Sequence, residues 1–181
     1  MKAIVIGCPG SGKSTFAKEL SESTDTPLYY LDRMNWNSDK TTVSREIFDK
    51  RLSTVLQRDE WIIDGNYMRT MEKRMAKSDV IYLFDLPTKI CIEGVRERIG
   101  KKHEDLPWIE TEIDKDFINF IKDFRTKSLP KIYELTEKFS SKIIVFKSRQ
   151  DAEKYLSEIK EEPTEEKKAE VKTEPEPVKE E

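Results

Sequence analysis

Five short runs of apolar, β-branched or aromatic residues divide this chain. Turn residues follow each run, and after them apolar residues recur every three or four positions, which is the alternation expected of repeated strand–helix units. The pattern predicts β-strands at residues 2–6, 27–31, 61–64, 80–84 and 142–146.

Helical periodicity is clearest in two of the intervening stretches. Its spacing predicts that each stretch packs one face of a helix against the core. A further helix after Pro87 should end near Gly100, and Ser128 followed by Pro130 predicts the start of another. The periodic residues are Ile47, Phe48, Leu52, Val55 and Leu56 in the first stretch, and Ile113, Phe117, Phe120, Ile121 and Phe124 in the second.

Strands that alternate with helices predict an α/β fold of three layers, in which helices cover both faces of a five-stranded parallel sheet. In such open sheets, ligands bind beyond the carboxyl ends of the strands. The residues that directly follow each predicted strand are therefore the first candidates for a functional site.

Length and composition fit one such domain followed by a charged tail. The chain has 181 residues, enough for a single α/β domain with a buried core. Residues 161–181 contain nine Glu and four Lys, a formal charge of −5, so that of the chain's net −3 the first 160 residues carry +2. Such a tail buries too little apolar surface to offset its chain entropy. We expect a folded domain over 1–160 and a disordered tail over 161–181, with a tethered interaction segment as the alternative to a solvating extension.

Composition also restricts location and partners. Charged residues make up 38% of the chain, no apolar run approaches the roughly 20 residues of a membrane span, and the N-terminus lacks a secretory pattern. We expect a cytoplasmic protein without membrane contact, in which Cys8 and Cys91 are free thiols. The mildly positive body lacks the dense basic stripe of a nucleic-acid binder and suits a small anionic ligand. Whether the protein is a monomer or a homodimer stays open.

A phosphate-binding loop follows the first predicted strand. Residues 7–14 read GCPGSGKS, which matches the G-x-x-x-x-G-K-[ST] pattern in full and precedes a helical stretch. Its glycines allow backbone N–H groups to surround phosphate oxygens, Lys13 brings a charge to the β- and γ-phosphates, and the Ser14 hydroxyl is suited to ligate Mg²⁺. We expect ATP with Mg²⁺ to bind at Gly7, Pro9, Gly10, Ser11, Gly12, Lys13, Ser14 and Thr15.

The second strand is followed by Asp32, Arg33 and Trp36. A carboxylate at this place is able to accept a proton from an acceptor hydroxyl or to hold a Mg²⁺-bound water, whereas a turn or capping aspartate is the plain alternative. Arg33 is a candidate partner for an anionic acceptor group and Trp36 for a ring, although both are also ordinary surface and packing residues.

The third strand ends in Asp64 and Gly65, an arrangement typical of a Walker B carboxylate that binds Mg²⁺ directly or through water. Gly65 allows an acceptor to approach closely, and a generic Asp-Gly turn is the alternative. Asn66, Tyr67 and Arg69 follow along the same rim and are candidate acceptor contacts.

A short lid is predicted after the fourth strand, at about residues 100–112, where Gly, Pro and charged residues occur without periodicity. Arg96 and Arg98 precede it, and Arg125 follows one helix later. Arginines on a closing flap neutralise the transferred phosphoryl group, but near a helix C-terminus they also simply complement the helix dipole. His103, which lacks neighbours of metal-ligand type, is expected to face solvent.

The fifth strand is followed by Ser148 and Arg149. In a nucleotide-binding sheet this loop borders the base, so both are candidate contacts for adenine or ribose. Helix capping explains Ser148 equally well.

Together these motifs resemble those of the adenylate-kinase-like P-loop kinases, and among them the small bacterial DNA topology modulation proteins. The matching segments are the phosphate loop up to Phe16, Leu31 to Arg33 with Trp36, Trp61 to Tyr67, and Asp85 to Pro87. The similarity covers about residues 1–158 and excludes the tail. It implies a five-stranded parallel core with a lid and an ATP-dependent phosphotransferase.

The residues expected to contact the phosphoryl acceptor resemble those of more than one kind of kinase. Asp64 and Gly65 resemble the start of the D-G-F-P-R segment of adenylate kinase, but the arginine here, Arg69, stands one place later. The stretch after Asp32 is also short for a domain that binds a nucleoside monophosphate. Asp32 instead resembles the strand-end carboxylate of shikimate, gluconate and nucleoside kinases, whose acceptor is a hydroxyl. The family name implies an effect on DNA supercoiling, yet the sequence shows no DNA-binding motif.

The sequence therefore predicts a Mg²⁺/ATP kinase of a small molecule. Ser14 and Asp64 would hold the metal, Asp32 would orient or deprotonate the acceptor, and Lys13 with the arginines would stabilise the transferred charge. Two alternatives stay open: a regulatory nucleotide switch, and a nucleoside triphosphatase with water as the acceptor.

Overall fold

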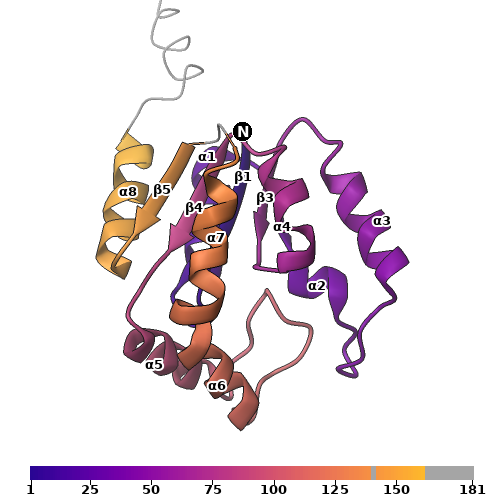
Figure 1. The fold of residues 1–181 in the computed structure, drawn as a ribbon, viewed down its shortest axis with the longest axis vertical. Helices are drawn as coiled ribbons and strands as arrows, with labels where there is room; N and C mark the ends of the chain where they lie inside the picture. Colours follow the sequence, from indigo (N-terminus) through magenta and orange to yellow (C-terminus); the bar gives the residue numbers. More distant parts are fainter. Residues whose placement is uncertain (140–141, 162–181) are drawn as a thin grey trace, which may run out of the picture.

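Five parallel strands form a single sheet in the order β2-β3-β1-β4-β5 in the computed structural model, which describes residues 1–139 and 142–161 (Figure 1). The central strand β1 pairs with β3 on one side and with β4 on the other, so that Ile4 lies between Ile63 and Ile81. All five predicted strands are confirmed. They are β1 (Lys2–Gly7), β2 (Leu28–Tyr30), β3 (Trp61–Asp64), β4 (Val80–Phe84) and β5 (Lys142–Phe146).

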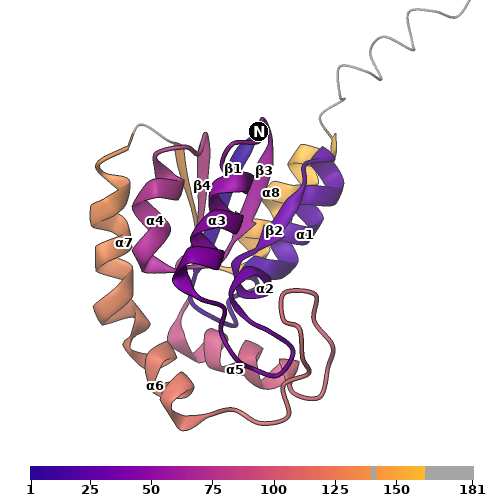
Figure 2. The same cartoon turned by 90° about the vertical axis from the view of Figure 1, so that its right-hand side faces the viewer.

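Helices cover both faces of the sheet (Figures 1 and 2). On one face lie α1 (Lys13–Thr24) and α8 (Arg149–Glu161), and on the other lie α4 (Met68–Met75) and α7 (Leu129–Thr136). Ala3, Ile4, Val5 and Ile6 of β1 are fully buried, as expected of a strand that is packed on both sides. The predicted three-layer architecture is confirmed. Residues 162–181, most of the predicted tail, lie outside the described residues.

The carboxyl ends of the strands face a second group of segments. Here α2 (Leu31–Asn35) and α3 (Arg45–Val55) flank β2, while α5 (Thr88–Arg98) and α6 (Lys115–Asp123) cross below the sheet in Figure 2. Residues 100–114, which join α5 to α6 without regular secondary structure, run back towards α2; we call this segment the 100–114 loop. The backbone N–H of Gly100 donates to the carbonyl of Glu110 at 2.7 Å, which ties the two ends of the loop together.

The helix start predicted from Ser128 and Pro130 is confirmed: α7 begins at Leu129, with Ser128 at its N-cap and Pro130 in its first turn. A π-helical turn, Phe124–Ser128, connects α6 directly to α7. Pro130 has no N–H to continue an α-helical ladder, and the wider turn, in which the N–H of Leu129 donates to the carbonyl of Phe124, accommodates the ring without ending the helix.

Two residues of the predicted apolar stripes do not face the core. Ile47 is 47% exposed and Phe120 is 44% exposed, whereas the next residue in each helix, Phe48 or Ile121, is buried. Successive residues of an α-helix point about 100° apart, so only one of each adjacent pair can occupy the centre of the packed face. Ile113 precedes α6 altogether.

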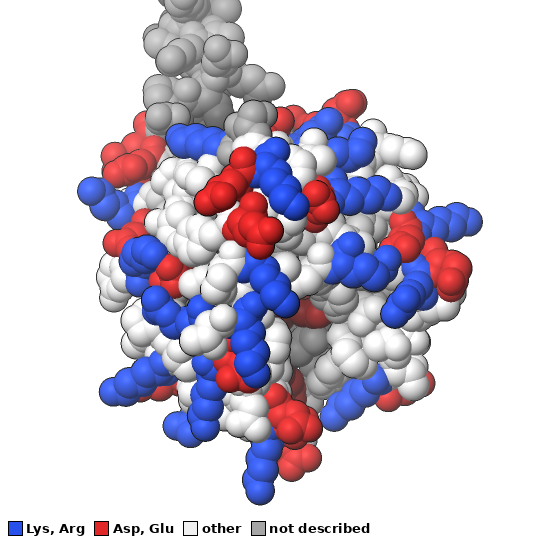
Figure 3. All heavy atoms as spheres, viewed as in Figure 1, with Lys and Arg blue, Asp and Glu red and all other residues white. Residues whose placement is uncertain are grey.

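The surface carries charges of both signs. Figure 3 shows Lys and Arg side chains interspersed with Asp and Glu over the face that it presents. Within residues 1–139 and 142–161, no helix combines the length and apolar character needed to cross a bilayer.

Candidate active site

The phosphate loop joins the end of β1 to the start of α1, as its sequence predicts. Gly12 caps α1 with φ 103° and ψ 3°, a left-handed conformation that glycine adopts without strain, and Lys13 and Ser14 begin the helix. The loop borders a cleft of about 520 Å³ at the carboxyl edge of the sheet. Gly12 to Phe16 line one wall of the cleft, and residues of α5, the 100–114 loop and α8 line the others.

Close packing against α5 holds the loop in place. A Cβ atom added to Gly10 would lie 2.1 Å from the carbonyl oxygen of Cys91, and one added to Gly94 would lie 2.1 Å from the carbonyl oxygen of Gly10. Backbone therefore meets backbone at this contact, and both positions require glycine. Cys8 and Cys91, which lie on the two sides of this contact, are buried free thiols, in agreement with the sequence.

Asn66 connects the end of β3 to the phosphate loop. Its Nδ2 donates to the carbonyl of Gly7 at 2.8 Å, and its Oδ1 accepts from the N–H of Gly7 at 3.0 Å. The fully buried guanidinium of Arg74 holds this segment from α4, because it donates to the carbonyls of Gly65, Asn66 and Tyr67. Burial lowers the pKa of Arg74 to about 9, so this side chain remains a cation at neutral pH. Asn66 is thus placed to position the loop.

Replacing Asn66 with Ala should loosen the loop. Both backbone groups of Gly7 would lose their partner, which should lower the free energy of unfolding by about 1–3 kcal/mol. Denaturant titration measures this loss, and calorimetry with ATP should show weaker binding. Unchanged values for both quantities would contradict the positioning role.

Lys13 lies among carboxylates. Its Nζ is 3.9 Å from Asp64 Oδ1, and the Asp64 side chain is only 4% exposed. Burial opposes the charged form of Lys13, but the neighbouring charges of Asp64, Asp32 and Asp105 raise its pKa above the ordinary value. Burial likewise raises the pKa of Asp64, against the effect of Lys13 and of the Ser14 hydroxyl beside it. The structure thus brings together the lysine, the serine and the strand-end carboxylate that the sequence predicts.

Asp32 faces the same group of charges from the first turn of α2. The hydroxyl of Tyr67 donates to Asp32 Oδ1 at 2.8 Å, and the Tyr67 ring stacks on Phe48 with centroids 5.1 Å apart. Burial raises the pKa of Asp32, while Lys13 and the Tyr67 hydrogen bond act in the opposite direction. Asp32 is a half-buried, oriented carboxylate with a pKa above its ordinary range, which suits a general base better than a capping residue.

A Tyr67→Phe variant should shift the pH dependence of any reaction that uses Asp32 as a base. The tyrosine hydrogen bond favours the ionised carboxylate, so its loss should raise the pKa of Asp32 further. Activity that requires ionised Asp32 falls as the pH drops through that pKa, so the acidic limb of the pH–rate profile should move to higher pH. An unmoved acidic limb would show that Asp32 does not act as this base.

Arg98 is brought to the cleft, but it is not free. Its two terminal nitrogens donate to the two carboxylate oxygens of Asp105 at 2.9 and 3.0 Å, and its Nε donates to Glu110 at 3.1 Å. Asp105, in the 100–114 loop, is 6% exposed. Its Oδ2 also accepts from the Ser14 hydroxyl at 3.4 Å. The loop is therefore closed over the phosphate loop through this carboxylate.

Arg149 approaches the phosphate loop from the start of α8. It donates to the carbonyl of Gly10 at 3.0 Å and lies next to Gly12. Ser148 and Asp151 form a reciprocal cap, since the N–H of each donates to the side chain of the other. The structure thus favours capping for Ser148 and places Arg149 at the cleft.

Two further contacts of the 100–114 loop involve predicted acceptor residues. Arg33 Nε donates to the carbonyl of Glu104 at 2.6 Å, and Trp36 meets Trp108 edge to face with centroids 5.6 Å apart. Both residues hold the loop against α2. His103, which the sequence places in solvent, is instead partly buried and lines the cleft.

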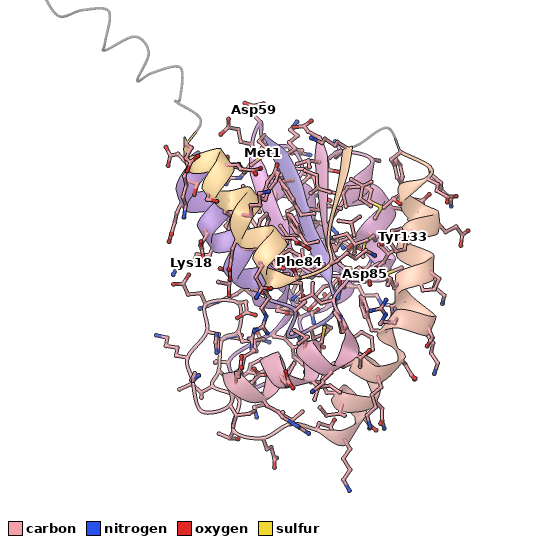
Figure 4. All side chains as sticks on the ribbon, turned by 90° about the vertical axis from the view of Figure 1, so that its left-hand side faces the viewer. Met1, Lys18, Asp59, Phe84, Asp85 and Tyr133 are labelled. Atoms are coloured by element: carbon pink, nitrogen blue, oxygen red, sulfur yellow. The ribbon has the colours of Figure 1, made fainter. Side chains whose placement is uncertain are left out.

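Three predicted arginines do not reach the cleft. Arg69 forms a paired interaction with Asp49 of α3, at 3.0 and 2.6 Å. Arg96 is exposed on α5 and is not among the residues that line the cleft. Arg125 lies 3.5 Å from Asp85, which also accepts from Tyr133 and Lys147. Figure 4 shows Asp85 and Tyr133 close together beside α7.

Two residues of the site were missed from the sequence. No motif or periodicity marks Asp105, whose role depends on a loop that returns to a distant segment. Arg74 carried a signal, because it lies four residues after Thr70 and three after Met71, on the buried face of α4. A cation at the centre of an apolar face indicates buried acceptors.

The donors present fit a magnesium–nucleotide complex. Asp64 Oδ1 is buried and has no hydrogen-bond partner among the described residues, and the Ser14 hydroxyl lies beside this carboxylate. Hydroxyl and carboxylate oxygens are ligands that Mg²⁺ prefers, and phosphates complete its shell. No group of three or more His, Cys, Asp or Glu that could hold a metal alone occurs in the described part of the chain.

Solved structures share this fold. Shikimate kinase from Aquifex aeolicus matches with a TM-score of 0.52 and 17% identity, over 88% of this chain and 93% of that one. Shikimate kinase from Bacteroides thetaiotaomicron matches with a TM-score of 0.54 and 18% identity, over 88% and 95%. Deoxyadenosine kinase from M. mycoides, solved with products dCMP and dCDP, matches with a TM-score of 0.51 and 15% identity, over 88% and 96%. The fold is therefore an adenylate-kinase-like α/β P-loop fold. No family model and no curated protein matches the chain.

Proposed function

We propose that this protein is an ATP-dependent phosphotransferase that transfers a phosphoryl group to a hydroxyl of a small molecule. The single observation that carries the proposal is the position of Asp32. This oriented carboxylate, held by Tyr67, lies close enough to Lys13 of the phosphate loop for their charges to interact. A proton acceptor next to a phosphate loop is the arrangement that transfer to a hydroxyl requires.

The roles follow from the contacts. The phosphate loop binds the triphosphate, Lys13 neutralises its terminal oxygens, and Arg149 borders the nucleotide at the start of α8. Ser14 and Asp64 would hold the Mg²⁺, which supplies charge neutralisation at the β- and γ-phosphates when bound. Asp32 orients the acceptor hydroxyl and takes up its proton. Positioning and electrostatics carry nearly all of the catalysis.

The acceptor side argues against a nucleoside monophosphate. Arg69, the residue that stands nearest to the adenylate kinase pattern, is paired with Asp49, and Arg33 is bound to the 100–114 loop. Neither guanidinium is free for a second phosphate, whereas Asp32 would repel one. The kinases of shikimate and deoxyadenosine among the similar folds also support an uncharged hydroxyl as the acceptor.

We also propose a cytoplasmic location, as the sequence suggests, and a 100–114 loop that acts as the lid. Membership of the DNA topology modulation family, which the sequence resemblance suggests, is also part of this proposal.

The proposal is tested by measuring ADP formation from Mg²⁺/ATP with a panel of nucleosides, nucleoside monophosphates and small hydroxylated metabolites. We expect one hydroxylated class to accelerate ADP formation, with the phosphorylated acceptor as the second product. ADP release that no acceptor changes would indicate a triphosphatase. Tight ATP binding without any turnover would indicate a nucleotide switch, and either outcome would refute the kinase.

A further inference from the structure

Asp105 reaches the phosphate loop from a distant segment. The 100–114 loop passes next to α1 and α2, where Glu104 binds Lys18 at 2.6 Å through its side chain and Arg33 through its carbonyl. These contacts place the next residue, Asp105, beside Ser14, with 3.4 Å between Oδ2 and the serine hydroxyl. Ser14 is the residue whose hydroxyl the phosphate-loop motif assigns to the metal.

The Ser14 hydroxyl consequently lies near two carboxylates of different origin. Asp64 ends β3, and Asp105 belongs to the 100–114 loop; both side chains are less than a tenth exposed. Asp64 Oδ1 has no hydrogen-bond partner among the described residues. A hydroxyl with two buried carboxylates, one of them with an unpartnered oxygen, provides the hard oxygen ligands that a divalent cation prefers.

The charges around Lys13 also favour a bound divalent cation. Lys13 Nζ lies 3.9 Å from Asp64 Oδ1, and the charges of Asp32 and Asp105 also act on it. Arg98, whose charge also acts on Lys13, is already bound by Asp105 and Glu110. Around Lys13 and Arg98, four carboxylates therefore outnumber the two cations: Asp32, Asp64, Asp105 and Glu110. A free nucleotide is repelled there, whereas a nucleotide with a divalent cation is not.

We propose that Asp105 is a ligand, carried by the 100–114 loop, for the Mg²⁺ of the bound nucleotide. The metal–nucleotide complex then strengthens loop closure, whereas the nucleotide alone does not. The inference rests on nucleotide binding, the first part of the proposed function, and is independent of the acceptor.

The opposite role makes the opposite prediction. If Asp105 only fills the place of a phosphate and keeps Arg98 occupied until ATP arrives, its removal should free Arg98 and tighten nucleotide binding. If Asp105 binds the metal, its removal should weaken binding in Mg²⁺ and leave binding in EDTA unchanged or tighter. The sign of the change in Mg²⁺ separates the two roles.

The experiment measures affinity for the non-hydrolysable nucleotide AMP-PNP by calorimetry, with Mg²⁺ and with EDTA, for the full chain. For Asp105→Asn we expect the ratio of the two affinities to fall at least tenfold relative to the unmodified protein. Glu112→Gln is the matched control, because it removes the same charge from an exposed position of the loop that does not line the cleft. This control should leave the ratio within about twofold of the unmodified protein.

Binding of Mg²⁺–AMP-PNP to Asp105→Asn that is as tight as, or tighter than, that of the unmodified protein would overturn the proposal. A second measurement needs no variant: trypsin cleavage after Lys101 and Lys102, which are exposed in the loop, should be slowed by AMP-PNP with Mg²⁺ but not by AMP-PNP with EDTA. Equal protection in both conditions would also overturn it. Neither readout involves phosphoryl transfer, so a protein that passes both tests and phosphorylates nothing would refute the proposed function alone.

Discussion

Replacing Lys13 with Ala is expected to abolish phosphoryl transfer in practice, with a fall in rate of about 10³-fold or more. Lys13 lies among the carboxylates Asp64, Asp32 and Asp105, and unlike Arg98 it is not tied to one of them by a hydrogen bond. Its loss removes the side-chain cation that neutralises the terminal phosphate oxygens, so both ATP affinity and the rate at saturating ATP should fall. ADP formation at a series of ATP concentrations measures both.

The fold should persist in this variant. Asp64 would lose its nearby cation, but a buried carboxyl with a raised pKa can take up a proton instead of remaining an unpaired anion. Thermal unfolding followed by circular dichroism checks this point. Lys50→Ala, an exposed lysine of α3, is the control and should change neither activity nor unfolding. Transfer that survives in the Lys13 variant would refute the mechanism.

Replacing Asp32 with Asn should separate binding from transfer. Asparagine keeps the size of the side chain and an acceptor oxygen for Tyr67, but it cannot take up the proton of an acceptor hydroxyl. We expect the rate of phosphoryl transfer to fall by about 10²–10⁴-fold, the usual contribution of a positioned general base. The affinity for Mg²⁺/ATP should not weaken, because a carboxylate near the triphosphate has been removed. Single-turnover kinetics and calorimetry measure the two quantities separately.

The matched control is Asp59→Asn. Asp59 is exposed and lies near Met1 at the opposite edge of the sheet from the phosphate loop (Figure 4), so this variant makes the same chemical change far from the cleft. It should leave transfer unchanged. Full activity in the Asp32 variant would leave the kinase without a base and would refute the role that we assign to Asp32.

Sequence reasoning was most successful where function depends on local backbone. The phosphate loop needs glycines at defined positions between a strand and a helix, and all of these signals occur within residues 2–24. Asp32 and Asp64 were found for a related reason. In a parallel sheet the residues after each strand share one edge, so the strand pattern alone predicts that these carboxylates meet the loop.

The sequence by itself determined the order of strands and helices, the parallel sheet and the edge at which the phosphate loop, Asp32 and Asp64 converge. Only the tertiary structure decided which arginines reach the cleft, and that Arg98 is bound there by Asp105 while Arg69 and Arg125 pair with Asp49 and Asp85. The physical reason is that long cationic side chains bind whichever carboxylate the fold brings near them. Helical periodicity predicts which residues face the core. It does not predict which charged residues of distant segments the fold brings together.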